Sequence, residues 1–234
     1  MALGHPPISE AGQRSIVAAP AYIVRVCRSA FGCPRALCDG AALRDEAVLR
    51  LEAARLEELL RQRVSGPILT HHKFRLAIAG CPNACSEPQI ADFGLVGQVD
   101  PYPIPDRCTG CGACQRACLE GAVEVGPAGP VFDRKLCVGC GDCCAACPSG
   151  AIAGEKGFRV LVGGKLGRHP RLADTWLERA DEARAWQALA AVLELWRTHG
   201  EKGERIGTLL QRLGTAALPR LLPPSAPAQE IPRS

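Results

Sequence analysis

The 234-residue sequence is poor in aromatic side chains and in long apolar runs. Five Phe, three Trp and two Tyr residues leave few rings to stack on nucleic-acid bases, and the formal net charge is a mild +4. No stretch approaches the roughly 20 apolar residues that cross a bilayer. The N-terminal stretch MALGHPPISEAGQRS lacks the basic start and apolar core of a secretory signal. We therefore expect a cytoplasmic protein with no membrane span and no nucleic-acid partner.

Cysteine, in contrast, is abundant, with 14 residues in the chain. An even number in a secreted protein would indicate disulfides, but no signal peptide is visible and the cysteines cluster at short gaps. Neighbours this close rarely bridge each other well, yet they can surround a metal cluster. The sequence therefore predicts metal centres in a reducing, anaerobic cytoplasm, because oxygen attacks exposed iron-sulfur clusters.

An internal repeat carries eight of these cysteines. CTGCGACQRAC and CVGCGDCCAACP share the spacing C-x2-C-x2-C-x3-C and lie 29 residues apart. Segment 105–152 thus resembles a bacterial two-cluster ferredoxin, in which three close cysteines hold one 4Fe-4S cluster and the fourth reaches the other. The predicted ligands are Cys108, Cys111, Cys114 and Cys147 for one cluster, and Cys137, Cys140, Cys143 and Cys118 for the other. Leu119 replaces the usual proline, and a zinc-binding repeat is the alternative.

Two cysteine pairs lie upstream of the repeat. Cys27 and Cys33 have C-x5-C spacing, and Cys81 and Cys85 stand in GCPNAC, so four thiols are available for a third cubane. This pattern, together with the later motifs ADFGLVGQ and GFRVLVGGKLGRHPRLA, resembles the signature of the sirohaem sulfite and nitrite reductases. The resemblance covers about residues 24–213, with the ferredoxin repeat inserted as in dissimilatory and anaerobic sulfite reductase subunits.

The resemblance implies a mechanism. Cys85 would give a thiolate shared between the cubane and the sirohaem iron, with Pro82 and Asn83 holding the turn. An external electron donor protein would feed the ferredoxin clusters, and sulfite would be reduced to sulfide by six electrons. Nitrite reduction at the same site, a non-catalytic electron-transfer protein with three cubanes, and a sirohaem-binding sensor stay open, because an ordinary cubane needs the same four cysteines.

Cations are expected around this centre, because sirohaem carries carboxylates and its small inorganic substrate is an anion. Lys73 and Arg75 are two residues apart and would share one face of a strand just ahead of Cys81. For each cation, a solvated surface charge is the alternative. The predicted substrate-facing residues are Lys73, Arg75 and Lys165, and the predicted cofactor-binding residues are Arg25, Arg28, Asn83, Arg168 and Arg171.

The periodicity predicts an α+β fold in which strands alternate with helices. Strands are expected at AYIVRVC, FRLAIAG, IADFGLVGQV and FRVLVGG, and helices over 41–63, around Trp186–Trp196 and around 206–213. Relatives of this type consist of two related halves, whereas 26 residues precede Cys27, so the resemblance implies that a homodimer or a partner subunit completes the pocket. The predicted units are an N-terminal extension (1–20), a discontinuous reductase half-domain (21–104 and 153–218), the two-cluster ferredoxin domain (105–152) and a disordered Pro-rich tail (219–234).

Overall fold

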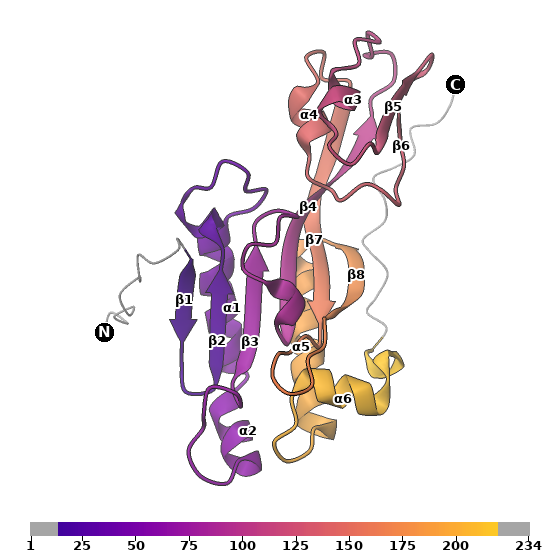
Figure 1. Cartoon of the computed structure of the whole chain (residues 1–234). Helices are drawn as coiled ribbons and strands as arrows, with labels where there is room; N and C mark the ends of the chain where they lie inside the picture. Colours follow the sequence, from indigo (N-terminus) through magenta and orange to yellow (C-terminus); the bar gives the residue numbers. More distant parts are fainter. Residues whose placement is uncertain (1–13, 220–234) are drawn as a thin grey trace.

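The computed structural model describes residues 14–219, so most of the predicted N-terminal extension and nearly all of the predicted tail lie outside it. A six-stranded sheet has the strand order β1-β2-β3-β4-β7-β8 (Figure 1). Strand β2 is parallel to β3, and β3 to β4, while the other neighbours are antiparallel. The strands are β1 (Ser15–Ala18), β2 (Tyr22–Val26), β3 (Phe74–Ala79), β4 (Phe93–Pro103), β7 (Ile152–Val162) and β8 (Asp174–Ala180).

Helices cover one face of this sheet (Figure 1). Alternate strand residues, such as Val24 and Ile78, join the main apolar core with Leu43 of α1 and Leu189 of α5. Arg25 lies between Val24 and Val26 on β2, so its side chain points to the opposite face of the sheet. The main-core helices are α1 (Gly40–Ala53), α2 (Leu56–Arg63), α5 (Glu182–His199) and α6 (Ile206–Leu213), and three short 3-10 helices are η1 (Arg28–Phe31), η2 (Pro88–Ile90) and η3 (Thr215–Ala217).

The prediction of one continuous helix over 41–63 is wrong. Arg55 adopts a left-handed conformation with φ of 51°, which breaks the segment into α1 and α2. Within α1, Leu51 is buried while Leu49 is 61% exposed. The four predicted strands and the two C-terminal helices are confirmed, and β1 and β8 are strands that the sequence pattern did not show.

A long hairpin carries the cysteine repeat away from the sheet. Strands β4 and β7 pair from Phe93↔Val162 to Pro103↔Ile152, and the intervening residues form a small unit at the hairpin tip (Figure 1). This unit, residues 105–151, is called the insert below. Its elements are α3 (Ala113–Ala117), β5 (Val123–Gly126), β6 (Gly129–Phe132) and α4 (Asp142–Ala146). None of the helices within residues 14–219 is long and apolar enough to cross a membrane.

Candidate cluster and anion site

Parallel strands bring the two upstream cysteine pairs to one edge of the sheet. Cys27 follows β2 directly, and Cys81 follows β3 after one glycine. The backbone N–H groups of Ser29 and Gly80 donate to Cys27 Sγ over 3.4 and 3.2 Å. A Cβ on Gly80 would lie 2.4 Å from Ser29 Cβ, so the position has no room for a side chain. Two backbone N–H donors thus hold this buried sulfur in place at the end of β2.

The GCPNAC turn presents its second cysteine to solvent. Ala84 is left-handed with φ of 53°, and its N–H donates to the Cys81 carbonyl over 3.1 Å. Asn83 Nδ2 donates to Cys85 Sγ over 2.9 Å, while Cys85 itself is exposed. Burial raises the pKa of the Cys81 thiol, and the nearby thiols of Cys27, Cys85 and Cys33 raise it further. The structure therefore gathers all four upstream cysteines around one place.

The insert repeats its local geometry as well as its sequence. Gly112 and Gly141 precede α3 and α4 with φ of 68° and 77°. Ala122 N–H donates to Cys118 Sγ over 3.2 Å, and in the second repeat Ala151 N–H donates to Cys147 Sγ over the same distance. One small cavity is lined by the four cysteines that the repeat assigned to a common cluster, which are Cys108, Cys111, Cys114 and Cys147.

Among residues 14–219, no three His, Cys, Asp or Glu side chains are arranged to hold a single metal ion. The thiols of the first set surround a small cavity, and closely spaced cysteine thiolates are the ligands of cuboidal iron-sulfur clusters. Cys38 and Cys144 belong to none of the three predicted ligand sets. Burial raises the pKa of Cys38 to about 12, and Cys144 Sγ donates to the Ala153 carbonyl over 3.5 Å.

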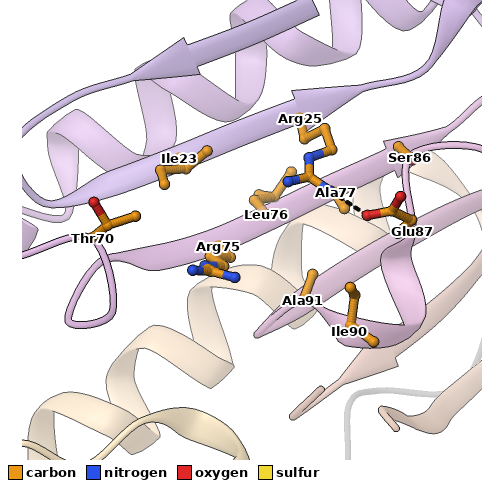
Figure 2. Close-up of a pocket in the computed structure, with 10 residues that line it drawn as sticks. All are labelled: Ile23, Arg25, Thr70, Arg75, Leu76, Ala77, Ser86, Glu87, Ile90 and Ala91. Atoms are coloured by element: carbon orange, nitrogen blue, oxygen red, sulfur yellow. Dashed lines mark hydrogen bonds and ion pairs between the residues drawn. The ribbon is translucent and has the colours of Figure 1, made fainter. Parts of the chain in front are cut away.

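A pocket of about 130 Å³ opens on the sheet face opposite the main helices, near the end of the GCPNAC turn (Figure 2). Arg25 from β2 and Arg75 from β3 supply its cations. Glu87 accepts from Arg25 over 2.5 Å and from Arg14 over 2.9 Å. The residues that line the pocket are Ile23, Arg25, Thr70, Arg75, Leu76, Ala77, Ser86, Glu87, Ile90 and Ala91.

Two donors at this pocket lack partners. Arg75 Nε and Ser86 Oγ are both buried and make no hydrogen bond within the described part of the chain. Burial lowers the pKa of Arg75, and the cations of Arg205 and Arg25 lower it further. An unpaired buried donor costs about 1–3 kcal/mol. A small oxyanion or a carboxylate would satisfy both donors, so the residues present fit an anionic group.

Behind the pocket, a buried ion pair fixes the start of β3. Asp92 accepts from Arg205 Nη2 over 2.6 Å and from Arg205 Nε over 3.1 Å. The same carboxylate accepts the backbone N–H of Arg75 over 2.8 Å. Burial raises the pKa of Asp92, and Arg205 opposes that rise. Sequence reasoning missed Ser86, Glu87, Asp92 and Arg205, because no motif links residues as far apart as Asp92 and Arg205.

The other predicted cations lie outside this pocket. Lys73 donates to the Ala19 carbonyl over 2.8 Å, and Lys165 donates to Thr208 Oγ1 over 2.8 Å on α6. Arg171 donates to the Gly163 carbonyl over 2.8 Å and pairs with Asp174. Two predicted cofactor-binding residues are exposed, namely Arg28 and Arg168. The structure thus joins Arg25 and Arg75 in one pocket and places Lys73, Lys165 and Arg171 in local contacts elsewhere.

The chain matches a known protein family over most of its length. Residues 26–226 match the family described as "Nitrite and sulphite reductase 4Fe-4S domain". The chain belongs to this family. The membership in the sulfite and nitrite reductase family that the cysteine motifs predicted is therefore confirmed.

Relatives of the chain carry names from the same chemistry. It is 38% identical over 146 residues to the coenzyme F420-dependent sulfite reductase of Methanocaldococcus jannaschii. The aligned region covers 61% of this chain and 23% of that relative. It is 42% identical over 52 residues to a subunit of the anaerobic sulfite reductase of Salmonella typhimurium, covering 22% of this chain and 15% of that relative. The matched regions thus span less than a quarter of the length of either relative.

A solved structure supports the fold independently. The crystal structure of dissimilatory sulfite reductase I superposes with a TM-score of 0.57 over 89% of this chain and 55% of that one, at 19% identity. At this identity the likeness shows the fold alone. The α+β fold of a sulfite and nitrite reductase is therefore established, and this chain corresponds to about half of the solved one.

Proposed function

We propose that this chain is the cluster-carrying half of a sirohaem-dependent sulfite reductase. The observation that carries the proposal is one sheet edge where four cysteines meet beside a pocket with two arginines and two unpartnered donors. Cys27, Cys33, Cys81 and Cys85 would hold the cubane. Bound there, the cubane and sirohaem would relay electrons from an external donor to sulfite, which needs six of them to become sulfide. Support for Cys85 as the shared thiolate comes from its exposure and from the Asn83 amide that orients it.

The arginines of the pocket would bind and orient the anion. A guanidinium stays protonated in proteins, so Arg25 and Arg75 can neutralise and polarise an oxyanion but do not supply the protons that the reaction consumes. Ser86 Oγ can donate a further hydrogen bond. Lys73 and Lys165, predicted to face the substrate, would have to leave Ala19 and Thr208 to do so. For the tetrapyrrole carboxylates we propose contacts from Arg28, Arg168 and Arg171, while Arg25, predicted to bind the cofactor, is assigned to the substrate anion.

The insert would deliver the electrons. We propose that its eight repeated cysteines hold two 4Fe-4S clusters, which an external donor protein reduces. A second copy of the chain or a partner subunit would complete the pocket, and this is supported by the arginine-bearing sheet face and by the 55% share of the solved chain. Nitrite has the same electron count and the same need for cations, so it is the alternative substrate.

Anaerobic reconstitution with iron, sulfide and sirohaem tests the proposal. We expect about twelve cluster irons and one haem iron per chain, visible bands of sirohaem, and turnover of sulfite with reduced viologen. Cys85→Ser should abolish turnover, whereas Cys38→Ser, which changes a thiol outside the ligand sets, should retain it. Three clusters without sirohaem bands would instead indicate an electron-transfer protein, and full activity of Cys85→Ser would reject the shared thiolate. Parallel assays with nitrite decide between the two substrates.

A further inference from the structure

The two cysteine sets of the insert have equivalent sequences but different surroundings. The cavity of the first set, which contains Cys108 and Cys147, is lined entirely by residues of the 108–152 segment, and Cys108 and Cys111 are exposed. Cys140 of the second set instead lines a cavity of about 400 Å³ that it shares with Cys81 of the sheet. The second set is therefore the one that faces the sheet cysteines.

An ion pair spans the boundary of this shared cavity. Arg35, in the loop after Cys33, donates to Asp142 Oδ2 over 2.7 Å, and both residues line the cavity. Cys140 and Cys81 line the same cavity, so the guanidinium shares this space with one cysteine from each set.

The repeat itself marks Asp142 as a special residue. Its counterpart 29 positions earlier is Ala113, which follows Gly112 just as Asp142 follows Gly141. A carboxylate beside the negatively charged cluster of four thiolates is electrostatically unfavourable unless a cation compensates it. The sequence places this carboxylate in the repeat that meets Arg35.

Backbone contacts hold the second repeat in the same place. Val99 N–H donates to the Gly139 carbonyl over 2.8 Å, and a Cβ on Gly139 would lie 3.0 Å from Gln98 Cβ. Arg134 adds a second ion pair between the insert and the sheet, to Asp100 near the insert end of β4. The insert is therefore fixed against the sheet by contacts at both sides of the second repeat.

We propose that Arg35 and Asp142 are the positioning residues of an electron-transfer junction between the second cysteine set of the insert and the four sheet cysteines. The inference rests on the cluster sites of the proposed function and adds an order to them: the first set, with Cys108 and Cys111 exposed, faces the external one-electron donor. In each transfer, the cluster that the second set would hold loses one electron and the cluster that the sheet cysteines would hold gains one, and no bond or proton changes place. The Arg35 cation offsets the negative charge that the sheet side gains.

The test uses the full chain with reconstituted clusters, anaerobically, and dithionite as the reductant. Arg35→Gln and Asp142→Ala are compared with Arg134→Gln, the matched control, which also removes an ion pair between insert and sheet but lies away from the shared cavity. Iron content should match the wild type in all three. In Arg35→Gln, redox titration followed by electron paramagnetic resonance should show the midpoint potentials of the second and sheet clusters shifted to more negative values. Asp142→Ala should weaken the magnetic coupling between these two reduced clusters.

Signals are assigned with Cys81→Ser, which removes the sheet cluster. Unchanged potentials and coupling in both Arg35→Gln and Asp142→Ala, at normal iron content, would overturn the junction. Equal shifts in Arg134→Gln would overturn it too, because they would show a general loosening of the insert. Neither sulfite turnover nor sirohaem enters this test, so failure of the reductase assignment and failure of the junction are separately visible.

Discussion

Glu87 places a carboxylate on Arg25 inside the pocket where we propose that an anion binds (Figure 2). Glu87→Gln should release Arg25 and strengthen sulfite binding by about 1 kcal/mol, roughly fivefold in Kd, because the competing charge is half exposed. Titration of the reconstituted protein with sulfite, followed in the sirohaem bands, measures the change. The control is Glu57→Gln, which removes an exposed ion pair on α2 to Arg61. Equal affinity in both variants and the wild type would contradict the competition.

Arg205 neutralises the buried carboxylate of Asp92, which in turn accepts the Arg75 backbone N–H. Arg205→Met should destabilise the fold by about 3 kcal/mol, because it leaves a buried charge without its partner. Urea denaturation of the full chain measures the loss. The double variant Asp92→Asn with Arg205→Met removes both charges and should lose less. A larger loss in the double variant would show that the two residues act independently.

How far single residues could be predicted depends on how local their signal is. The cysteines of the insert follow a short, fixed spacing, and the structure places Cys108, Cys111, Cys114 and Cys147 around one small cavity. Their role as cluster ligands stays a prediction. Arg25 and Arg75 were noticed because each lies on a strand that leads to a cysteine, Cys27 after β2 and Cys81 after β3. Ser86, Glu87 and Arg205 were missed, because folding brings them to the site from places that carry no pattern.

At the scale of elements, strand prediction succeeded where a short apolar run is bounded by glycine or cysteine, as in β3. Helix prediction failed between α1 and α2, because the left-handed conformation of Arg55 is invisible to a rule that counts apolar spacing. Strands β1 and β8 were missed because their alternation is weak, with Ile16 48% exposed at the sheet edge. Each of them is a strand because it pairs with its neighbour, β1 with β2 and β8 with β7, and its own sequence does not reveal this.

The junction of β3 with the cysteine turn depends on a residue without a side chain. Gly80→Ala should push Ser29 away, because the added Cβ would lie 2.4 Å from Ser29 Cβ, and it should disturb both N–H donors on Cys27. We expect the variant to lose about four irons, one cubane, and to keep the clusters of the insert. Iron and sulfide analysis measures this. Gly203→Ala, in the open loop after α5, is the matched glycine control and should keep all clusters. Full iron content in Gly80→Ala would contradict the role.

At the scale of the whole molecule, the fold separates a sheet that builds the site from an insert that is attached by two strands. The sheet core consists of β-strand and helix residues outside the insert, and the insert has a small apolar cluster of its own that contains Val123 and Cys143. The cysteine repeat predicted a separate domain over 105–152, and these boundaries stay a prediction. The position of the insert against Gln98 and Val99 could not be predicted, since it depends on backbone contacts.

Removing the insert tests this separation. Ile104 N–H donates to the Ala151 carbonyl over 2.9 Å, so the two strands of the hairpin are still paired where the insert begins. Replacing residues 105–150 with Asn-Gly should close the hairpin with a two-residue turn. The shortened chain should unfold cooperatively, because its main core is intact, and bind about four irons instead of about twelve. Circular dichroism on heating and iron analysis measure both.

The shortened chain also separates the two tasks that we assign to the molecule. It keeps Arg25, Arg75 and the four sheet cysteines, so it should still bind sulfite in the presence of sirohaem, while reduction by an external donor protein should slow strongly because the exposed first cysteine set is gone. Dithionite, a small reductant, should reach the sheet cluster directly and keep it reducible. A shortened chain that lost cooperative unfolding would show instead that the contacts of Gly139 and Arg134 are part of the sheet's own stability.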